Sequence, residues 1–181
     1  MTRWTAIDMA MLVLATVLSG CGFHPLYGKI DGRPGAQAIF TSMYIPPITL
    51  ERVGYELRND LIDDLQASAT PSNALYDLRV GLTAKTEPIA IQNQIIGLLK
   101  EVEITRYNYT LTAEYQLVDR KTQKVITKGT ESSLSAYDVV VSPYATLVAQ
   151  HDAQAHTAED ISQRLRLKLA VYFVQHPGAG K

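Results

Sequence analysis

The spacing of apolar residues along the chain predicts two amphipathic helices. The first covers residues 49–68, where Val53, Leu57, Leu61 and Leu65 recur every four positions and therefore share one helix face. Thr49 is the expected cap of its first turn, and Pro71 prevents its continuation. Gly54 and Ile62 flank the same stripe.

The second predicted helix is longer and covers residues 144–175. Ser142 supplies a cap, and Pro143 suits the first helical position because the amide it lacks would have no partner there. The apolar stripe of this helix consists of Ala158, Ile161, Leu165, Leu169 and Tyr172.

Four segments carry the signature of strands. Residues 75–87 and 101–119 alternate between apolar and polar positions, as half-buried strands do, and residues 124–136 are predicted to form a strand with a mostly polar face. The clearest alternation places Tyr107, Tyr109, Leu111, Ala113, Tyr115 and Leu117 on one side of residues 101–119. Residues 37–48 are rich in β-branched and aromatic side chains and are predicted to form the first strand, which Pro46 and Pro47 end. A loop is expected at residues 88–100 and a hairpin turn at residues 120–123.

The resulting order, β-α-β-β-β-α, predicts an α+β domain with two helices packed on one face of a four-stranded, mostly antiparallel sheet. The last three strands form a meander, and the first strand joins the sheet through the first helix. The tyrosines of residues 107–115 are expected beneath the helices, since tyrosine is comfortable half-buried. The other sheet face, rich in Thr, Asn, Glu and Gln, is left open to water or to a partner.

The N-terminus has the layout of a secretory signal. Arg3 precedes a ten-residue apolar run, residues 9–18, which is too short to span a membrane. Leu18-Ser19-Gly20-Cys21 follows and resembles the lipobox of bacterial lipoproteins, which implies cleavage before Cys21 and acylation of that cysteine. Gly22, rather than the aspartate that retains lipoproteins in the inner membrane, implies export to the outer membrane of a Gram-negative cell, on its periplasmic side.

Composition agrees with one folded domain behind this anchor. The chain is 46% hydrophobic and 19% charged, so it can build a core. We divide it into a signal segment at 1–20, a lipidated tether at 21–36, one domain at 37–176 and a tail at 177–181. Cys21 is the single cysteine, so no disulfide framework is expected. The formal net charge of −1 provides no basic field for nucleic acid.

The residues suggest no enzyme and no cofactor. His151, Asp152 and His156 look like a metal cluster, but on a helix only Asp152 and His156 share a face, and no third ligand is near. A glycine-flanked nucleophilic serine and a phosphate-binding loop are both absent. Asp63 and Asp64, like Glu101 and Glu103, are better explained as surface charges than as an acid/base pair.

Residues 21–28, Cys-Gly-Phe-His-Pro-Leu-Tyr-Gly, resemble the mature N-terminus of the lipopolysaccharide-assembly lipoproteins, the LptE family, in its alphaproteobacterial branch. Residues 144–158, leading into Ile161 and Leu165, also resemble the last helix of that family. The resemblance implies the same two-helix, four-strand fold. It also implies a non-enzymatic role as plug and assembly partner of the outer-membrane β-barrel that translocates lipopolysaccharide (LPS), with LPS itself as a ligand.

The expected LPS contacts are cations next to apolar side chains, because LPS carries phosphates and acyl chains. Lys100 and Arg106 flank the apolar residues 95–99 and are the first candidates, with Arg79 and Lys85 in support. The competing interpretation is that all four are ordinary solvated charges. Members of the family have a basic residue just inside the last helix, where this chain has Gln150 or His151.

Two other functions stay open at this point. The chain could be an envelope lipoprotein that serves a different outer-membrane or peptidoglycan machine. It could also be a secreted hydrolase, which would require a buried acid/base group in a cleft.

Overall fold

The computed structural model describes residues 36–67, 70–96 and 99–176, with side chains for all of these except residue 71 and residues 90–104. The signal segment, the tether up to residue 35, which includes Cys21, and the tail lie outside the described residues. The remaining chain forms helices α2 (Ala36–Phe40), α3 (Glu51–Leu65) and α4 (Pro143–Gln175), a short 3-10 turn (Pro71–Asn73), and four strands. The strands are β1 (Met43–Tyr44), β2 (Tyr76–Ile96), β3 (Leu99–Asp119) and β4 (Val125–Asp138).

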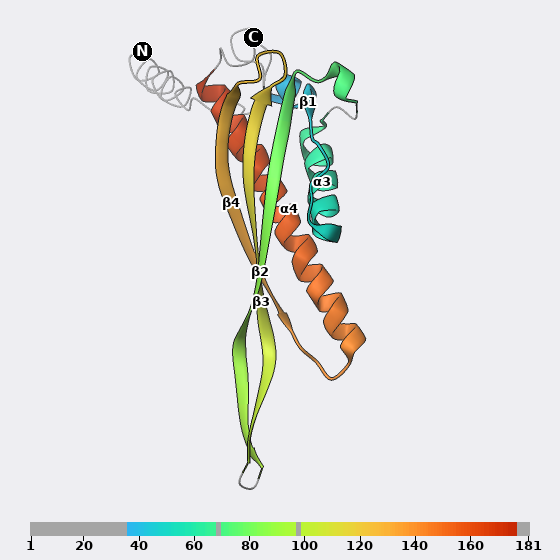
Figure 1. Cartoon of the computed structure of the whole chain (residues 1–181), viewed down its shortest axis with the longest axis vertical. Coiled ribbons are helices and arrows are strands. Elements are labelled where there is room, and N and C mark those ends of the chain that lie inside the picture. The colour runs from blue at the N-terminus through green and yellow to red at the C-terminus, as the bar shows by residue number, and fades with distance from the viewer. Residues whose placement is uncertain (1–35, 68–69, 97–98, 177–181) are drawn as a thin grey trace, which may run out of the picture.

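The four strands form one mixed sheet in the order β1-β2-β3-β4. β2, β3 and β4 are an antiparallel meander, and β1 runs parallel to β2 through the pairs Met43–Tyr76 and Tyr44–Asp77. A parallel neighbour requires a crossover, which α3 provides. The predicted fold class is therefore confirmed, and Figure 1 shows both longer helices on the same side of the sheet.

The predicted first strand over residues 37–48 was largely wrong. Residues Ala36–Phe40 form a helical turn, and only Met43 and Tyr44 pair with the sheet. Pro46 and Pro47 have no amide hydrogen to donate, so pairing cannot continue past them. The helical turn lets Phe40, which is fully buried, reach the core.

The first helix begins later than predicted, and Thr49 does not cap it. The cap position is Leu50, whose side chain makes no capping hydrogen bond, and Glu51 has a positive φ of 40°. The entry is fixed instead by the close approach of Gly54 to Ile48, where an added Cβ would lie 2.6 Å from the Ile48 carbonyl oxygen.

The loop predicted at residues 88–100 was also wrong. β2 continues to Ile96 and β3 begins at Leu99, so the hairpin projects past the ends of the helices (Figure 1). Pro88 is accommodated because the pairing register shifts between Pro88 and Ile91, and such irregularities are where strands tolerate proline.

The remaining predicted elements are confirmed. Ser142 Oγ accepts a hydrogen bond from Ala145 N at 3.4 Å, and Pro143 stands in the first turn of α4. At the β3–β4 turn, Asp119 Oδ1 accepts hydrogen bonds from Lys121 N at 2.8 Å and Thr122 N at 2.7 Å.

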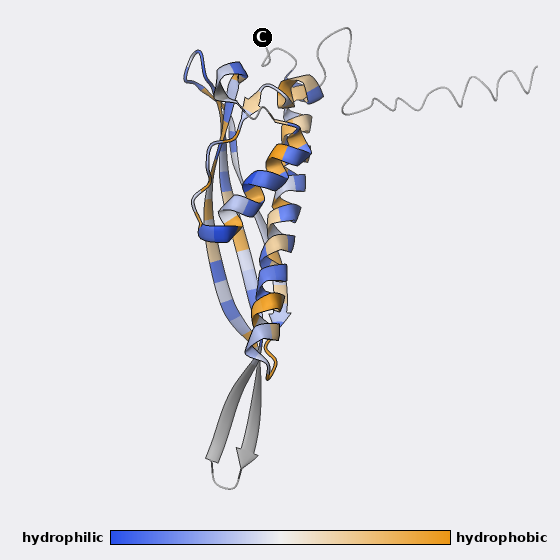
Figure 2. Cartoon of the chain, turned by 90° about the vertical axis from the view of Figure 1, so that its right-hand side faces the viewer, coloured by the Kyte–Doolittle hydropathy of each residue, from blue (hydrophilic) through white to orange (hydrophobic). Residues whose placement is uncertain are grey.

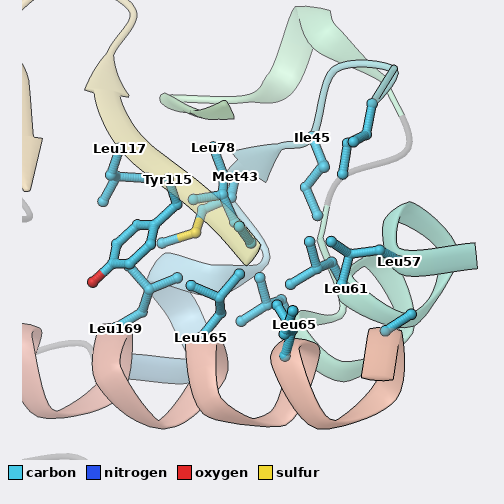
Figure 3. Packing of buried hydrophobic residues seen from close by; sticks show 14 of the residues in the cluster. Met43, Ile45, Leu57, Leu61, Leu65, Leu78, Tyr115, Leu117, Leu165 and Leu169 are labelled. Carbon is cyan, nitrogen blue, oxygen red and sulfur yellow. The ribbon is translucent and has the colours of Figure 1, made fainter. Parts of the chain in front are cut away.

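The core lies between the helices and the inner face of the sheet. In Figure 3, Leu57, Leu61 and Leu65 of α3 point toward Leu165 and Leu169 of α4, with strand side chains closing the cluster from the sheet side. Tyr109 and Tyr115 are buried and Tyr107 packs partly buried against the core, which confirms their expected place beneath the helices. Within the described ranges, no helix is both long enough and apolar enough to cross a membrane.

Candidate functional site

The outer face of the sheet is a polar surface. Residues of one parity on β2 and β3 point away from the helices, and cross-strand pairing places them side by side. Among them are Arg79 opposite Gln116, Gly81 opposite Glu114, Thr83 opposite Thr112 and Lys85 opposite Thr110. β4 extends this face, with Ser132 beside Thr112 and Thr130 beside Glu114. The predicted polar face thus exists, and none of the helices that the structure describes covers it (Figure 2).

The four candidate cations do not form one patch. Projected on β3, Arg79 lies at the position of Gln116 and Lys85 at that of Thr110, followed by Arg106 and Lys100. Neighbouring cations are therefore four to six residues apart, or roughly 13–20 Å at the rise of a strand. They form a line along the sheet rather than a cluster at a loop. The side chain of Lys100 lies outside the described residues.

Each of the three described cations of this line lies beside a carboxylate. Lys85 Nζ is 2.7 Å from Glu87 Oε1, Arg106 Nε is 3.5 Å from Asp138 Oδ1, and Arg79 Nη2 is 3.8 Å from Asp77 Oδ2. The pairs of Lys85 and Arg106 are exposed and contribute at most about 1 kcal/mol each, so these two cations can exchange their partners for a phosphate, whereas Asp77 is only 14% exposed.

Polar contacts fix α4 against β4. Ser133 Oγ donates a hydrogen bond to Asp160 Oδ2 at 2.6 Å, and Arg164 Nη2 pairs with the same oxygen at 2.8 Å. These two contacts hold the pKa of Asp160 below its ordinary value. Lys168 bonds the buried Glu131, and this hydrogen bond raises the pKa of the Lys168 ammonium. Asp160 and Lys168 therefore have structural roles, because each charge is already paired with a neighbouring side chain of the protein.

A groove between α3 and α4 contains a cation that the sequence patterns did not single out. The groove has a volume of about 250 Å³, and Gln150 and His151 of α4 line it together with Arg52 of α3. Arg52 Nη2 donates to the His151 carbonyl oxygen at 3.4 Å and pairs with Glu56 at 2.8 Å. Its position 99 residues from His151 explains why no local pattern could relate it to the last helix.

The β4–α4 connection forms an exposed apolar end. We call this the apolar end, and it comprises Val140, Val141, Tyr144, Leu147 and Val148, which are between 40% and 102% exposed. In Figure 2 the connection appears as a hydrophobic segment below the first turn of α4. A cluster of this kind is typical of a contact surface rather than of a solvated loop.

Nothing in the described part of the chain has the arrangement of a metal centre. Among the side chains that the structure describes, no three from His, Cys, Asp or Glu come close enough to hold an ion. His156 lies 4.0 Å from Glu159, one turn along α4. The predicted lipid attachment site, Cys21, lies outside the described residues.

A known protein family matches the part of the chain that forms this fold. The profile of the LptE family, described as lipopolysaccharide-assembly, matches residues 40–170 and so spans all four strands and most of both long helices. The chain belongs to the LptE family. Its place in LPS assembly, which the N-terminal resemblance implied, is thereby confirmed at the level of the family.

Relatives with similar chains and folds agree with this assignment. An uncharacterized protein of Rickettsia prowazekii is 25% identical over 166 residues, which cover 91% of this chain and 96% of that protein. A crystal structure of a candidate lipoprotein from Caulobacter crescentus superposes with a TM-score of 0.59 at 22% identity, covering 77% of this chain and 96% of the other. Rare lipoprotein B from Shewanella oneidensis gives a TM-score of 0.50 at 12% identity, covering 75% and 97%. At these identities the two structures establish a shared fold.

Proposed function

We propose that this member of the LptE family is anchored to the outer membrane through acyl chains on Cys21. There it supports the β-barrel that translocates LPS, as a plug and assembly partner and without enzymatic activity. The family match over residues 40–170 carries the proposal, and the lipobox at residues 18–21 supports the anchor. Several buried acyl chains hold a protein at a membrane far better than one.

The surface chemistry of the sheet fits such a partner. Large outer-membrane barrels have water-lined interiors, so a plug needs a polar, nearly neutral exterior. The outer sheet face supplies this, because its threonines and serines are interspersed with paired charges rather than with a field of one sign. The apolar end then offers a surface for apolar contacts with the partner at one end of the molecule.

Affinity purification from detergent-solubilised outer membranes tests the partner. We expect the tagged protein to co-elute with a large β-barrel in roughly equal amounts. The matched variant Cys21→Ser should lose its membrane attachment, because it has no thiol to acylate. Recovery of the protein alone, or with a different envelope machine, would refute the translocon assignment.

Direct LPS contact is a separate part of the proposal and has its own test. The line of Arg79, Lys85, Arg106 and Lys100 supplies cations along the sheet, and the exposed pairs of Lys85 and Arg106 leave these two available to phosphate. Arg106→Glu should weaken LPS binding severalfold in a salt-dependent manner. Lys121→Glu makes the same charge change in the β3–β4 turn, 15 residues from Arg106 along the chain, and should have little effect. Equal losses in both variants would mean that net charge alone governs binding.

A further inference from the structure

β4 is an edge strand of the sheet. The N–H and C=O groups along its backbone point alternately toward β3 and away from it. Val139 N donates to Thr105 O at 2.9 Å, and the register with β3 runs without a shift from Thr127 to Asp138. In an antiparallel pair, hydrogen-bonded positions alternate with positions that face away. The odd-numbered residues of this stretch therefore bond β3, and the N–H and C=O groups of the even-numbered residues point outward.

Three side chains of α4 bond backbone groups of β4 and of the residues just after it. Tyr172 Oη donates to Ile126 O at 3.0 Å, and Arg164 Nη1 donates to Ser132 O at 3.1 Å. Thr146 Oγ1 accepts from Val140 N at 3.1 Å and donates to Val140 O at 3.2 Å. Side-chain bonds of this kind protect an exposed edge against pairing with other chains.

The stretch between Ser132 and Val140 has no such cover from α4. The outward groups there belong to Leu134, Ala136 and Asp138, and in the described part of the chain no α4 side chain bonds them. The helix residues opposite are Ala145, Ala149 and Ala153, whose methyl groups are too short to reach.

These alanines and the open stretch of β4 enclose a pocket of about 390 Å³. Its remaining walls come from Val140, Asp152 and His156. Leu134, which is 59% exposed, directly precedes Ser135, the first strand residue that lines this pocket. An unpaired backbone edge and a pocket for a side chain thus occur together, at the end of β4 that leads into the apolar end.

We propose that Leu134–Asp138 is a docking edge at which an extended segment of the barrel partner pairs as a fifth strand. N–H and C=O groups that recur every second residue, about 6.6–7 Å apart, match another strand and not a lipid or a sugar. Strand addition uses such main-chain bonds for affinity and an adjacent pocket for specificity. The identity of the partner rests on the proposed function; the geometry of the edge does not.

The test removes the outward N–H of Ala136 while leaving the hydrogen bonds between β3 and β4 in place. Ala136→Pro removes an N–H that faces away from β3, a place where edge strands tolerate proline. Ala136→Val, its control, keeps the N–H and adds bulk to the same position. In the full-length protein purified with its own barrel, we expect the proline variant to bind at least about tenfold more weakly than the valine variant, with equal thermal melting of both. The loss of one backbone hydrogen bond to the incoming strand, together with the bulk of the ring, accounts for this factor.

Hydrogen exchange at single residues supplies a second readout that does not depend on a substitution. The amides of Leu134 and Ala136 should exchange fast in the free protein and become protected in the complex. Those of Ser133 and Ser135, which bond β3, should be protected in both.

The outcomes separate the two proposals. If the wild-type protein does not bind the barrel, the proposed function fails and this partner fails with it. If it binds, and the proline and valine variants bind equally without new protection at Leu134 and Ala136, docking at this edge is refuted and the proposed function stands. Pairing of two copies of this chain through β4, seen as a dimer by light scattering that Ala136→Pro abolishes, would also overturn the assignment to the barrel.

Discussion

Replacing Gly54 with alanine should destabilise the protein, although alanine is the better helix former. By propensity alone, alanine inside α3 would gain about 1 kcal/mol over glycine. The structure predicts the opposite sign. An alanine Cβ would lie 2.6 Å from the Ile48 carbonyl oxygen, 3.2 Å from the Ile48 carbonyl carbon and 3.3 Å from that of Thr49.

The size of the effect follows from that geometry. Carbon and oxygen atoms in contact normally lie about 3.3–3.6 Å apart. The segment before α3 must therefore move by about 0.7 Å or more, and because the obstructing atoms are backbone, no side-chain rotation relieves them. Overpacking of this kind costs about 1–3 kcal/mol. Because backbone atoms must move, the upper half of this range applies, and after the gain of about 1 kcal/mol in propensity we expect a net loss of about 1–2 kcal/mol.

Urea unfolding followed by circular dichroism measures this loss as a lower midpoint with an unchanged slope. Gly81→Ala is the matched control, because the nearest atom to its added Cβ is 4.0 Å away. That variant should be neutral or more stable by about 0.5 kcal/mol, as alanine is in a strand interior. A Gly54→Ala protein as stable as the wild type would refute the account of how α3 is entered.

Three further predictions concern the core and its polar contacts. Leu165→Ala, at a fully buried position, should cost about 3–4 kcal/mol by removal of a core side chain, measured by the same urea titration. Burial and neighbouring carboxylates raise the pKa of Asp60 above its ordinary 3.8, so the fold disfavours its ionised form. Asp60→Asn should therefore raise the urea midpoint at pH 7, and the gain should vanish as the pH falls below 3.8; a gain that persists there would point to a cause other than charge. Because the pKa of Asp160 is lowered, its bond with Ser133 stabilises the protein above pH 3.8 and is lost as the pH falls through the lowered pKa. Ser133→Ala should cost about 1 kcal/mol at pH 7 and less in acid, and a cost that does not change with pH would contradict this linkage.

Local periodicity was sufficient wherever one face of an element is buried along its whole length. The alternation of residues 107–117 and the stripe from Ala158 to Leu169 placed the right side chains in the core. Ser142 and Pro143 fixed the start of α4, because capping depends only on adjacent backbone groups.

Periodicity failed where a distant partner decides the conformation. The hairpin beyond Pro88 exists because β2 and β3 bond each other there, whatever covers their faces. Residues 37–48 have the composition of a strand, yet α2 forms because Phe40 finds its place in the core. The start of α3 depends on the close approach of Gly54 to the Ile48 carbonyl group, and neither residue type predicts such a contact.

Some features of the candidate surfaces could likewise be predicted from the sequence, whereas others depend on the tertiary structure. The sequence by itself supplied the resemblance of residues 18–21 to a lipobox, the polar character of the outer sheet face and the resemblance to the family, because these reside in adjacent or alternating residues. Only the tertiary structure placed Arg52 beside His151, spread the cations into a line and left Leu134–Asp138 uncovered between the contacts of Arg164 and Thr146. Each of these depends on residues far apart in the chain that meet only when α3 and α4 pack on the sheet, and a linear pattern carries no information about such meetings.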